Sequence, residues 1–444
     1  GRLARLGFSD AAASAELVAG WSQRTAAAQV DAVLAELQSA ADPDLALAGM
    51  NRLVLARDDL FEVLRSGDDV LPRLAAVLGA SVALGQHLGA HPEDLEVLTG
   101  PVDRRSVGEL RSRLLAAIGA EATLEQPVAA PDRSDDLRRA YRRELLRIAA
   151  RDLTAADPLA VLPDVAAELA DLADATVEAA LALARGEVPE WPDCRLGVVA
   201  LGKTGAGELN YVSDVDVLYI AEPALGPDGE PVCSVDRALS VATRLASALT
   251  RVCSAHTGAG TIWPIDAALR PEGKAGPLAR TLASHRAYYE RWAKNWEFQA
   301  MLKARPMAGD LELAGSFVDM VWPMVWRVAD DDQFVPQTQA MRLRVVELLP
   351  SRDANHEIKL GAGGLRDVEF SVQLLQLVHG RTDERLRLRG TFEALDALVK
   401  HGYVGRSDGF DLGTAYRLQR LLEHRVQLYQ LRRTHLMPAD ETNQ

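Results

Sequence analysis

Two aspartates separated by one residue, Asp214 and Asp216, are the strongest sign of chemistry in this sequence, and Ser213 precedes them. They enter a short β-branched apolar run, so we expect a strand, on which side chains two residues apart share a face. Two carboxylates held that close repel each other, and the pKa of one rises unless a cation bridges them. Mg²⁺ fits such a pair because it binds a few carboxylates together with substrate phosphates.

A third carboxylate, Asp266, lies in another strand-like segment, Thr261–Ala267. On a neighbouring strand it would face the first pair, and such a site can hold two metal ions that clamp an in-line phosphoryl displacement. We therefore predict Asp214, Asp216 and Asp266 as catalytic residues and metal ligands, with Mg²⁺, or alternatively Mn²⁺, as the cofactor. Asp266 has a second candidate role as general base. For an isolated Asp-x-Asp the competing interpretation is a surface turn or a helix cap.

A glycine-rich turn precedes the aspartates, in Gly202-Lys203-Thr204-Gly205-Ala206-Gly207. Glycine lets the backbone approach a phosphate closely, and consecutive amides can hold an anion. We predict phosphate or nucleotide binding by Gly202, Lys203, Gly205 and Ser213. The alternative for Lys203 is a solvated turn lysine.

The same region imitates a P-loop, because Gly197–Thr204 matches Gly-x4-Gly-Lys-Thr. A P-loop needs four flexible loop residues that wrap phosphates and a helix that follows them. Here the four residues are Val, Val, Ala and Leu, which belong in a strand, and Gly-Ala-Gly follows. We reject the P-loop interpretation.

Three more cations are candidates for phosphate binding: Arg270, Lys303 and Arg305. Arg270 follows Asp266 in a glycine-containing loop, and a structural salt bridge is its alternative role. Lys303 and Arg305 alternate with apolar residues in Phe298–Arg305, which we expect to be a strand. They either line the cleft or pair with acidic side chains.

Hydrophobic periodicity places these residues in a compact α/β unit between helical regions. Further strands are predicted at Leu196–Leu201 and Val215–Ile220, with a crossover helix at Arg237–Ser254. Helices are predicted elsewhere at Arg24–Ala41, Pro43–Asp59, Asp69–Gly79, Ser106–Gly119, Pro163–Arg185, Phe334–Leu349, Gly364–Val378, Thr391–His401 and Leu412–Thr434.

Composition restricts the partners. Lys and Arg number 49 and Asp and Glu 63, which gives a net charge of −14 over 444 residues. Such a balance disfavours polyanions, so we expect no nucleic-acid partner. Three widely spaced cysteines indicate a reducing cytoplasm. Without an apolar stretch of about 18 residues, we expect no membrane insertion. The chain starts without Met and ends in polar sequence, so we expect a piece of a longer protein.

The segment Gly202–Asp216 reads Gly-Lys-x-Gly-x-x-Glu-Leu-Asn-x-x-Ser-Asp-x-Asp and resembles the bifunctional glutamine synthetase adenylyltransferase/adenylyl-removing enzymes. Matching segments follow at Ala268–Gly273, Trp296–Asp310 and Ile358–Phe370. One departure is Asp367, where many members have Glu.

The resemblance implies an α+β, mostly α-helical fold. Its centre is a DNA polymerase β-like nucleotidyltransferase domain, a small mixed sheet with helices, flanked by N-terminal and C-terminal helical bundles. We place these parts at residues 1–130 (N-terminal helical region), 131–315 (catalytic domain) and 316–444 (C-terminal bundle). Gly361–Gly364 suits a tight loop before a helix whose N-terminus attracts anions, and a plain helix entry is the alternative. Arg366 and Glu369 on that helix are expected to face the cleft.

The family has two homologous halves, and this chain carries one copy of the motif. The N-terminal half usually has Asn where the C-terminal half more often has Gly, so Asn210 points to the N-terminal, adenylyl-removing half. The implied reaction is attack of phosphate on adenylyl-tyrosine of glutamine synthetase, which releases ADP and free tyrosine. The implied partners are adenylylated glutamine synthetase, phosphate, ADP and a PII-type regulatory protein. The alternatives are ATP-dependent adenylylation and a non-catalytic module that binds a PII-type protein.

Overall fold

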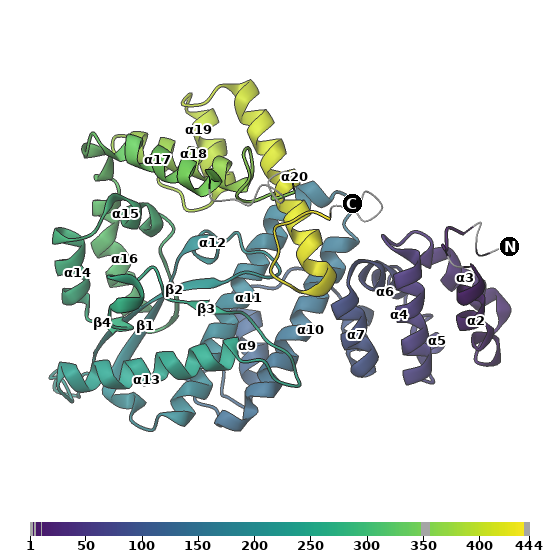
Figure 1. Ribbon diagram of the computed structural model, residues 1–444. Helices are drawn as coiled ribbons and strands as arrows, with labels where there is room; N and C mark the ends of the chain where they lie inside the picture. Colours follow the sequence, from purple (N-terminus) through teal and green to yellow (C-terminus); the bar gives the residue numbers. More distant parts are fainter. Residues whose placement is uncertain (1–2, 4–5, 10, 348–355, 439–444) are drawn as a thin grey trace. The chain divides into compact units, whose positions relative to one another are not determined.

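The computed structural model describes residues 3, 6–9, 11–347 and 356–438 (Figure 1). Contacts divide the chain into two compact units. The first contains residues 1–104, 142–165 and 421–435, and the second contains residues 105–141, 166–420 and 436–444. The division of the chain into three consecutive domains stays a prediction.

The first unit is helical. Asp42 caps α4 by accepting a hydrogen bond from Leu45 N, with Pro43 in the first turn, and Ser81 caps α7 in the same way. The close packing of α4 on α6 depends on Gly49, because a Cβ there would lie 2.8 Å from Leu78 Cδ2. The helices that lie wholly in this unit are α2 (Ala11–Ala19), η1 (Trp21–Gln23), α3 (Ala27–Leu37), α4 (Pro43–Ala56), α5 (Leu60–Val63), α6 (Val70–Ala80), α7 (Val82–Ala90), η2 (Pro92–Leu95) and α8 (Glu96–Thr99).

The second unit is built on a small mixed sheet. Among the described residues its strands are β1 (Cys194–Ala200), β2 (Val215–Pro223), β3 (Ile265–Asp266), β4 (Ala279–Arg280) and β5 (Arg305–Gly309). The order is β3-β2-β1-β5, and β4 also pairs with β2. β1 is antiparallel to β2 and β5, whereas β3 and β4 run parallel to β2.

Helices α13 (Val235–Ser254) and α16 (Leu311–Val325) pack on this sheet. Ser234 caps α13, and Asp310 caps α16 directly after β5. Val199 of β1 and Leu218 of β2 share an apolar cluster with Phe317 of α16, which fastens that helix to the strands.

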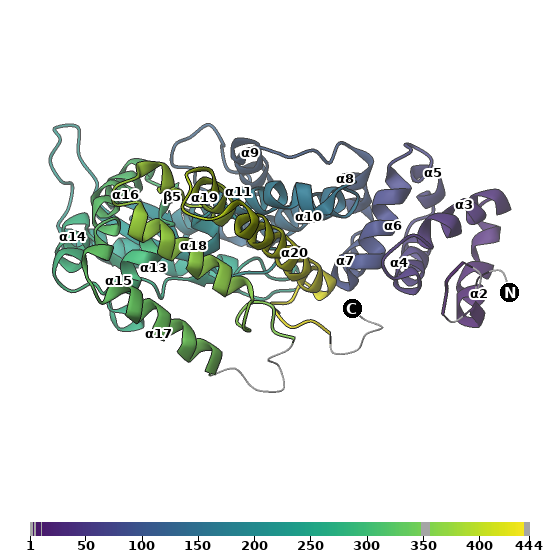
Figure 2. The same ribbon diagram turned by 90° about the horizontal axis from the view of Figure 1, so that it is seen from above.

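The remaining helices complete the fold. Figures 1 and 2 show α18 and α19 beside each other, and these two helices are in contact. Helices α10 (Ser134–Leu153), α11 (Pro158–Glu187) and α20 (Arg406–Gln430) contribute residues to both units. The second unit also contains α9 (Val107–Ala117), η3 (Pro131–Arg133), η4 (Trp191–Asp193), α12 (Gly202–Gly205), η5 (Gly273–Ala275), α14 (Leu282–Arg291), α15 (Asn295–Met301), η6 (Val328–Asp330), α17 (Phe334–Glu347), α18 (Leu365–His379), η7 (Glu384–Leu386) and α19 (Thr391–Lys400).

The α+β, mostly helical class with a small mixed sheet is confirmed, and the predicted helices are present with shifted ends. The predicted end of the 334–349 helix lies partly outside the described residues. The helices of residues 11–347 and 356–438 are all too short or too polar to cross a membrane.

Two strand predictions need correction. Most of Phe298–Arg305 is not a strand, because α15 occupies Asn295–Met301 and β5 begins only at Arg305. The Glu297 carboxylate accepts a hydrogen bond from Lys294 N and so starts a helix where the apolar alternation resembled a strand. In Thr261–Ala267 only Ile265–Asp266 pairs as a strand, since Pro264 has no N–H for the ladder.

Candidate functional site

The structure brings the three predicted carboxylates together. β2 and β3 are parallel neighbours with Asp216 opposite Asp266, and Asp214 precedes β2. Burial, followed by the charges of Asp266 and Asp214, raises the pKa of Asp216 to about 6, although two nearby cations lower it. All three side chains are partly exposed, and Asp266 Oδ1 accepts a hydrogen bond of 2.8 Å from Ala268 N.

These carboxylates fit a hard divalent cation that takes part of its ligand shell from a substrate. In the described part of the chain, no three His, Cys, Asp or Glu side chains form a ready-made metal cage. Burial first, and then repulsion from Asp266 and Asp214, raises the pKa of Asp216, and a bound cation would relieve that repulsion. Mg²⁺ typically binds through one or two carboxylates plus phosphate oxygens, which suits this arrangement.

Two glycines of the turn allow close approach to the site. The turn is the short helix α12, and Gly202 has φ +55°, a left-handed conformation that favours glycine. A Cβ on Gly202 would lie 2.2 Å from Asp216 Oδ2, and one on Gly205 would lie 2.1 Å from Lys303 O. Gly202 thus lets the turn lie against Asp216, and Gly205 lets it lie against the backbone of Lys303, while their contact with a phosphate stays a prediction.

Lys203 is held by the asparagine that the sequence motif singled out. Lys203 Nζ donates to Asn210 Oδ1 at 3.2 Å, and Asn210 Nδ2 donates to Val212 O at 2.9 Å. Asn210 is 1% exposed, so it is a fixed support. It shapes the turn that leads into Ser213, which is partly exposed beside the carboxylates, and it orients Lys203.

The guanidinium of Arg270 is engaged by its own loop. Arg270 donates to the backbone carbonyls of Ala267, Gly276 and Lys274 at 2.8, 3.1 and 3.2 Å. These contacts are with backbone carbonyls and not with an acidic side chain, so they give Arg270 a structural role other than the salt bridge expected as the alternative. Its contact with a phosphate stays a prediction.

Arg305 is similarly engaged. It pairs with Asp174 of α11, at 2.9 Å between Arg305 Nη2 and Asp174 Oδ1, and donates to Thr204 O at 3.0 Å. Of the two roles expected for Arg305, this geometry favours pairing with an acidic side chain. The hydrogen bond from Arg305 to Thr204 O also connects β5 to α12. Its contact with a phosphate likewise stays a prediction.

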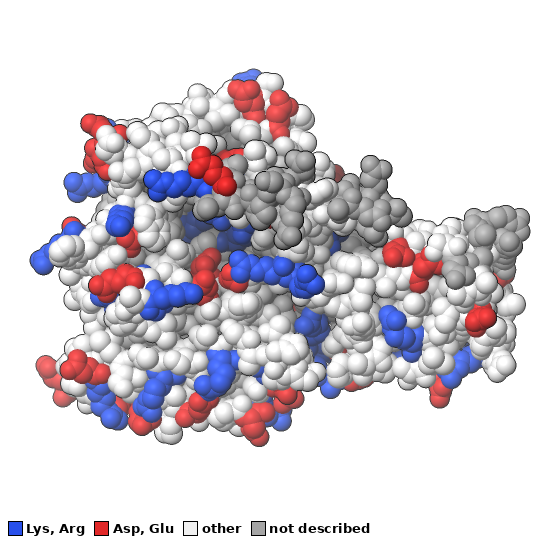
Figure 3. Space-filling model, in the orientation of Figure 1, with Lys and Arg blue, Asp and Glu red and all other residues white. Residues whose placement is uncertain are grey.

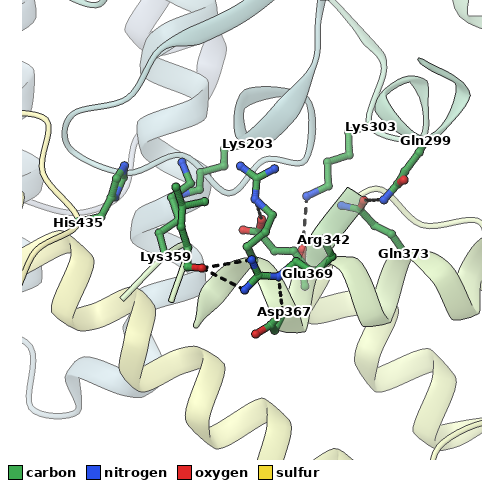
Figure 4. Close-up of polar contacts among 12 residues, drawn as sticks. Lys203, Gln299, Lys303, Arg342, Lys359, Asp367, Glu369, Gln373 and His435 are labelled. Atoms are coloured by element: carbon green, nitrogen blue, oxygen red, sulfur yellow. Dashed lines mark hydrogen bonds and ion pairs between the residues drawn. The ribbon is translucent and has the colours of Figure 1, made fainter. Parts of the chain in front are cut away.

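Lys303 lies in a buried ionic cluster around Glu369 of α18. Lys303 is 7% exposed, and its Nζ lies 3.4 Å from Thr391 Oγ1. In Figure 4 its side chain points toward α18. Burial would raise the pKa of Glu369, but four cations outweigh burial and hold that pKa below its usual range: Lys303, Lys203, Arg366 and Lys359.

The helices after residue 364 also hold the turn before the aspartates. Glu208 is buried, which raises its pKa, and its Oε1 accepts a hydrogen bond of 2.9 Å from Phe392 N. Arg420 of α20 donates to the carbonyls of Glu208 and Leu209 at 2.6 and 3.2 Å. The site therefore depends on elements on both sides of residue 316.

The glycine loop before α18 is a plain helix entry. Arg342 ion-pairs with Asp367 and donates to the carbonyls of Leu360 and Gly361, while Asp367 accepts from Gly363 N at 2.7 Å (Figure 4). The first helix amides are also engaged, since Leu365 N bonds Ile358 O and Arg366 N bonds Lys359 O. The geometry thus favours side chains over the helix N-terminus for binding an anion.

Figure 3 shows the result at the surface. Lys and Arg side chains line a hollow between the region of α12 and β2 and that of α18, with acidic side chains at its edge. Sequence reasoning missed Lys359, Thr391, Tyr416 and Arg420. Lys359 had a usable signal, because it lies in the motif Ile358–Phe370, whereas the other three had none.

Comparisons with known proteins match two family models to different parts of the chain. A family model described as glutamate-ammonia ligase adenylyltransferase matches residues 71–320, which include all three carboxylates. A second model, described as GlnD PII-uridylyltransferase, matches residues 339–444, which include Lys359, Arg366 and Glu369.

Curated relatives carry the name bifunctional glutamine synthetase adenylyltransferase/adenylyl-removing enzyme. The chain is 55% identical to the one from Cutibacterium acnes over 409 residues, which is 91% of this chain and 41% of that protein. It is 51% identical over 452 residues to the one from Streptomyces avermitilis, which covers 100% of this chain and 43% of the relative. For Mycolicibacterium smegmatis the identity is 47% over 420 residues, covering 93% and 40%. The chain thus spans about two fifths of the length of these relatives.

Proposed function

Because the chain belongs to the glutamate-ammonia ligase adenylyltransferase family, we propose that it removes AMP from adenylyl-tyrosine of glutamine synthetase. In this reaction an oxygen of inorganic phosphate attacks the adenylyl phosphorus, and the bond to the tyrosine oxygen breaks. The products are ADP and unmodified glutamine synthetase, and the proton of hydrogen phosphate ends on the tyrosine hydroxyl.

The observation that supports AMP transfer is the register of β2 and β3. It sets Asp216 opposite Asp266, with Asp214 close by, and the turn at Gly202 packs against Asp216. Phosphoryl transfer is catalysed mainly by positioning and by neutralisation of charge. Asp214, Asp216 and Asp266 are the groups we propose for holding Mg²⁺, or alternatively Mn²⁺, which when bound neutralises phosphoryl oxygens.

The direction of the reaction rests on Asn210. Asn is typical of the family's adenylyl-removing half at this position, and here its side chain holds Lys203. We propose a PII-type protein as regulator, since residues 339–444 match the PII-uridylyltransferase model.

The forward reaction is the second candidate, because the family model and the relatives are named for adenylyl transfer. The same carboxylates would serve ATP-dependent adenylylation of the tyrosine.

One assay separates removal of AMP from its addition. The chain is incubated either with adenylylated glutamine synthetase, Mg²⁺ and phosphate, or with unmodified synthetase, Mg²⁺ and ATP. We expect phosphate-dependent ADP in the first mixture. AMP-tyrosine in the second mixture, with no ADP in the first, would reverse the direction.

A further inference from the structure

Two cations lie close enough to Asp216 and to the buried Glu369 to act on both carboxylates. Lys359 and Arg366 act electrostatically on Asp216, and the same two act on Glu369. Neither was among the predicted phosphate ligands. Both side chains are partly exposed, so a bound anion can reach them.

Arg366 has an unused donor. Its Nε is buried and has no hydrogen-bond acceptor among the described residues. Glu369 Oε2 is 4.0 Å away, which is an ion-pair distance but too long for a hydrogen bond. A buried donor without an acceptor is costly, so Arg366 Nε is held beside Glu369 at some expense. The Arg366 side chain is 36% exposed, and it is this exposed part that a ligand oxygen can reach.

Glu369 is built into the fold as a support. It is 8% exposed, and Tyr416, which is 1% exposed, lies with its hydroxyl 3.3 Å from Glu369 Oε1. Four cations lower the pKa of Glu369 and so keep its carboxylate ionised. The negative charge of Glu369 in turn offsets the repulsion among these cations, which holds them close together. The buried Lys303 lowers the pKa of both Glu369 and Glu208 and so belongs to the same ionic cluster.

We propose that Lys203, Lys359 and Arg366 bind the attacking inorganic phosphate and that Glu369 positions them, which rests on the proposed function. Phosphate is a dianion near neutral pH, and the three carboxylates alone would repel it. The cations offset that repulsion and hold the phosphate for attack. Water carries no charge, so the same cations favour phosphate over water and make the product ADP instead of AMP.

The first test replaces the cations in the 444-residue chain. For Lys359→Gln and Arg366→Gln we expect the KM for phosphate to rise about 10-fold or more, as for loss of a charge-assisted hydrogen bond, with a smaller change in kcat. The AMP-to-ADP product ratio should rise with it. Lys400→Gln, an exposed lysine at the end of α19, is the matched control. If both variants keep the parent chain's KM for phosphate and its product ratio, the anion site is overturned. The proposed function would still stand in that case, because it depends only on turnover by the parent chain.

The second test addresses Glu369. Glu369→Gln keeps the shape but removes the charge, and we expect a higher KM for phosphate. Tyr416→Phe, which removes only the hydroxyl, should show a smaller rise. If Glu369 merely neutralised the cations, Glu369→Gln would lower the KM for phosphate, and that result would overturn its positioning role. Exposed Glu384→Gln controls for loss of a carboxylate.

A binding measurement separates this site from the reaction. Without metal or glutamine synthetase, phosphate should raise the Tm of the parent chain more than chloride does at equal ionic strength. Arg366→Gln should lose that shift, and Asp214→Asn should keep it. If the parent chain shows the shift but makes no ADP, the proposed function fails and the anion site stands. If it makes ADP but Arg366→Gln keeps the full shift, the anion site fails alone.

Discussion

The two sides of the hollow differ in how the chain builds them. The carboxylate side comes from two adjacent strands, and its central pair is separated by one residue, Asp214 and Asp216. The cationic side combines Lys203 with Lys359 and Arg366, more than 150 positions later, and depends on Glu369 and Tyr416 for support. The groups proposed to hold the metal therefore follow from local strand geometry, whereas Lys359 and Arg366 reach the site only through the tertiary fold.

The carboxylate side is where we expect the largest effect. Asp214→Asn combined with Asp216→Asn should lower kcat by about 10³-fold or more, because stabilisation of charge usually contributes most to catalysis in such sites. The Tm should stay the same or rise slightly, since the pKa of Asp216 is raised in the fold and its charged form is disfavoured there. Turnover assays and circular dichroism check both outcomes. If the double variant folded and still turned over substrate substantially, Asp214 and Asp216 would not be the metal ligands.

Substitution of Arg305 tests whether this predicted phosphate ligand has a structural role instead. Arg305→Gln leaves Asp174 buried without its partner, so we expect a loss of about 3 kcal/mol in the free energy of unfolding. The KM for phosphate should stay near that of the parent chain. Urea denaturation and steady-state kinetics measure the two quantities.

The double variant Asp174→Asn with Arg305→Gln is the control for that prediction, and it should recover part of the lost stability. If Arg305→Gln instead raised the KM for phosphate strongly and left the stability unchanged, Arg305 would be a phosphate-binding residue.

Gly202 tests the close approach to Asp216. Gly202→Ala introduces both a strained positive φ and a Cβ only 2.2 Å from Asp216 Oδ2, so we expect kcat to fall about 10-fold. Gly207→Ala is a matched control, because Gly207 has φ +69° but nothing within 4 Å of its Cβ. Thermal melting should show that Gly202→Ala loses at least as much stability as Gly207→Ala. Equal loss of kcat in the two would show that backbone strain, and not the contact with Asp216, is responsible.

Asn210 should give the smallest effect, because it acts on the cationic side through Lys203 alone. Asn210→Ala removes one hydrogen bond to Lys203 and one to Val212 O, and each is worth about 1 kcal/mol. We expect a few-fold rise in the KM for phosphate and an unchanged direction of reaction. Kinetics in both directions check this, and a switch to ATP-dependent adenylylation would make Asn210 a determinant of direction.

The family resemblance implied the α+β class. Local pattern predicted strands at Leu196–Leu201 and Val215–Ile220, which the structure places at Cys194–Ala200 and Val215–Pro223, and it predicted the proximity of Asp214 and Asp216. The reason is that strand alternation and helical periodicity act over a few residues. The same pattern misled at Phe298–Arg305, where a helix start set by Glu297 prevailed over apolar alternation.

Only the tertiary structure decided which cations face the carboxylates. In the sequence, Arg270, Lys303, Arg305 and Lys203 were equivalent candidates. Folding engages Arg270 with its own loop and Arg305 with Asp174, and it buries Lys303 between two carboxylates. The family resemblance led us to expect Arg366 at the cleft, but only folding brings Lys359 and Arg366 close enough to act on Asp216, more than 140 positions earlier in the chain.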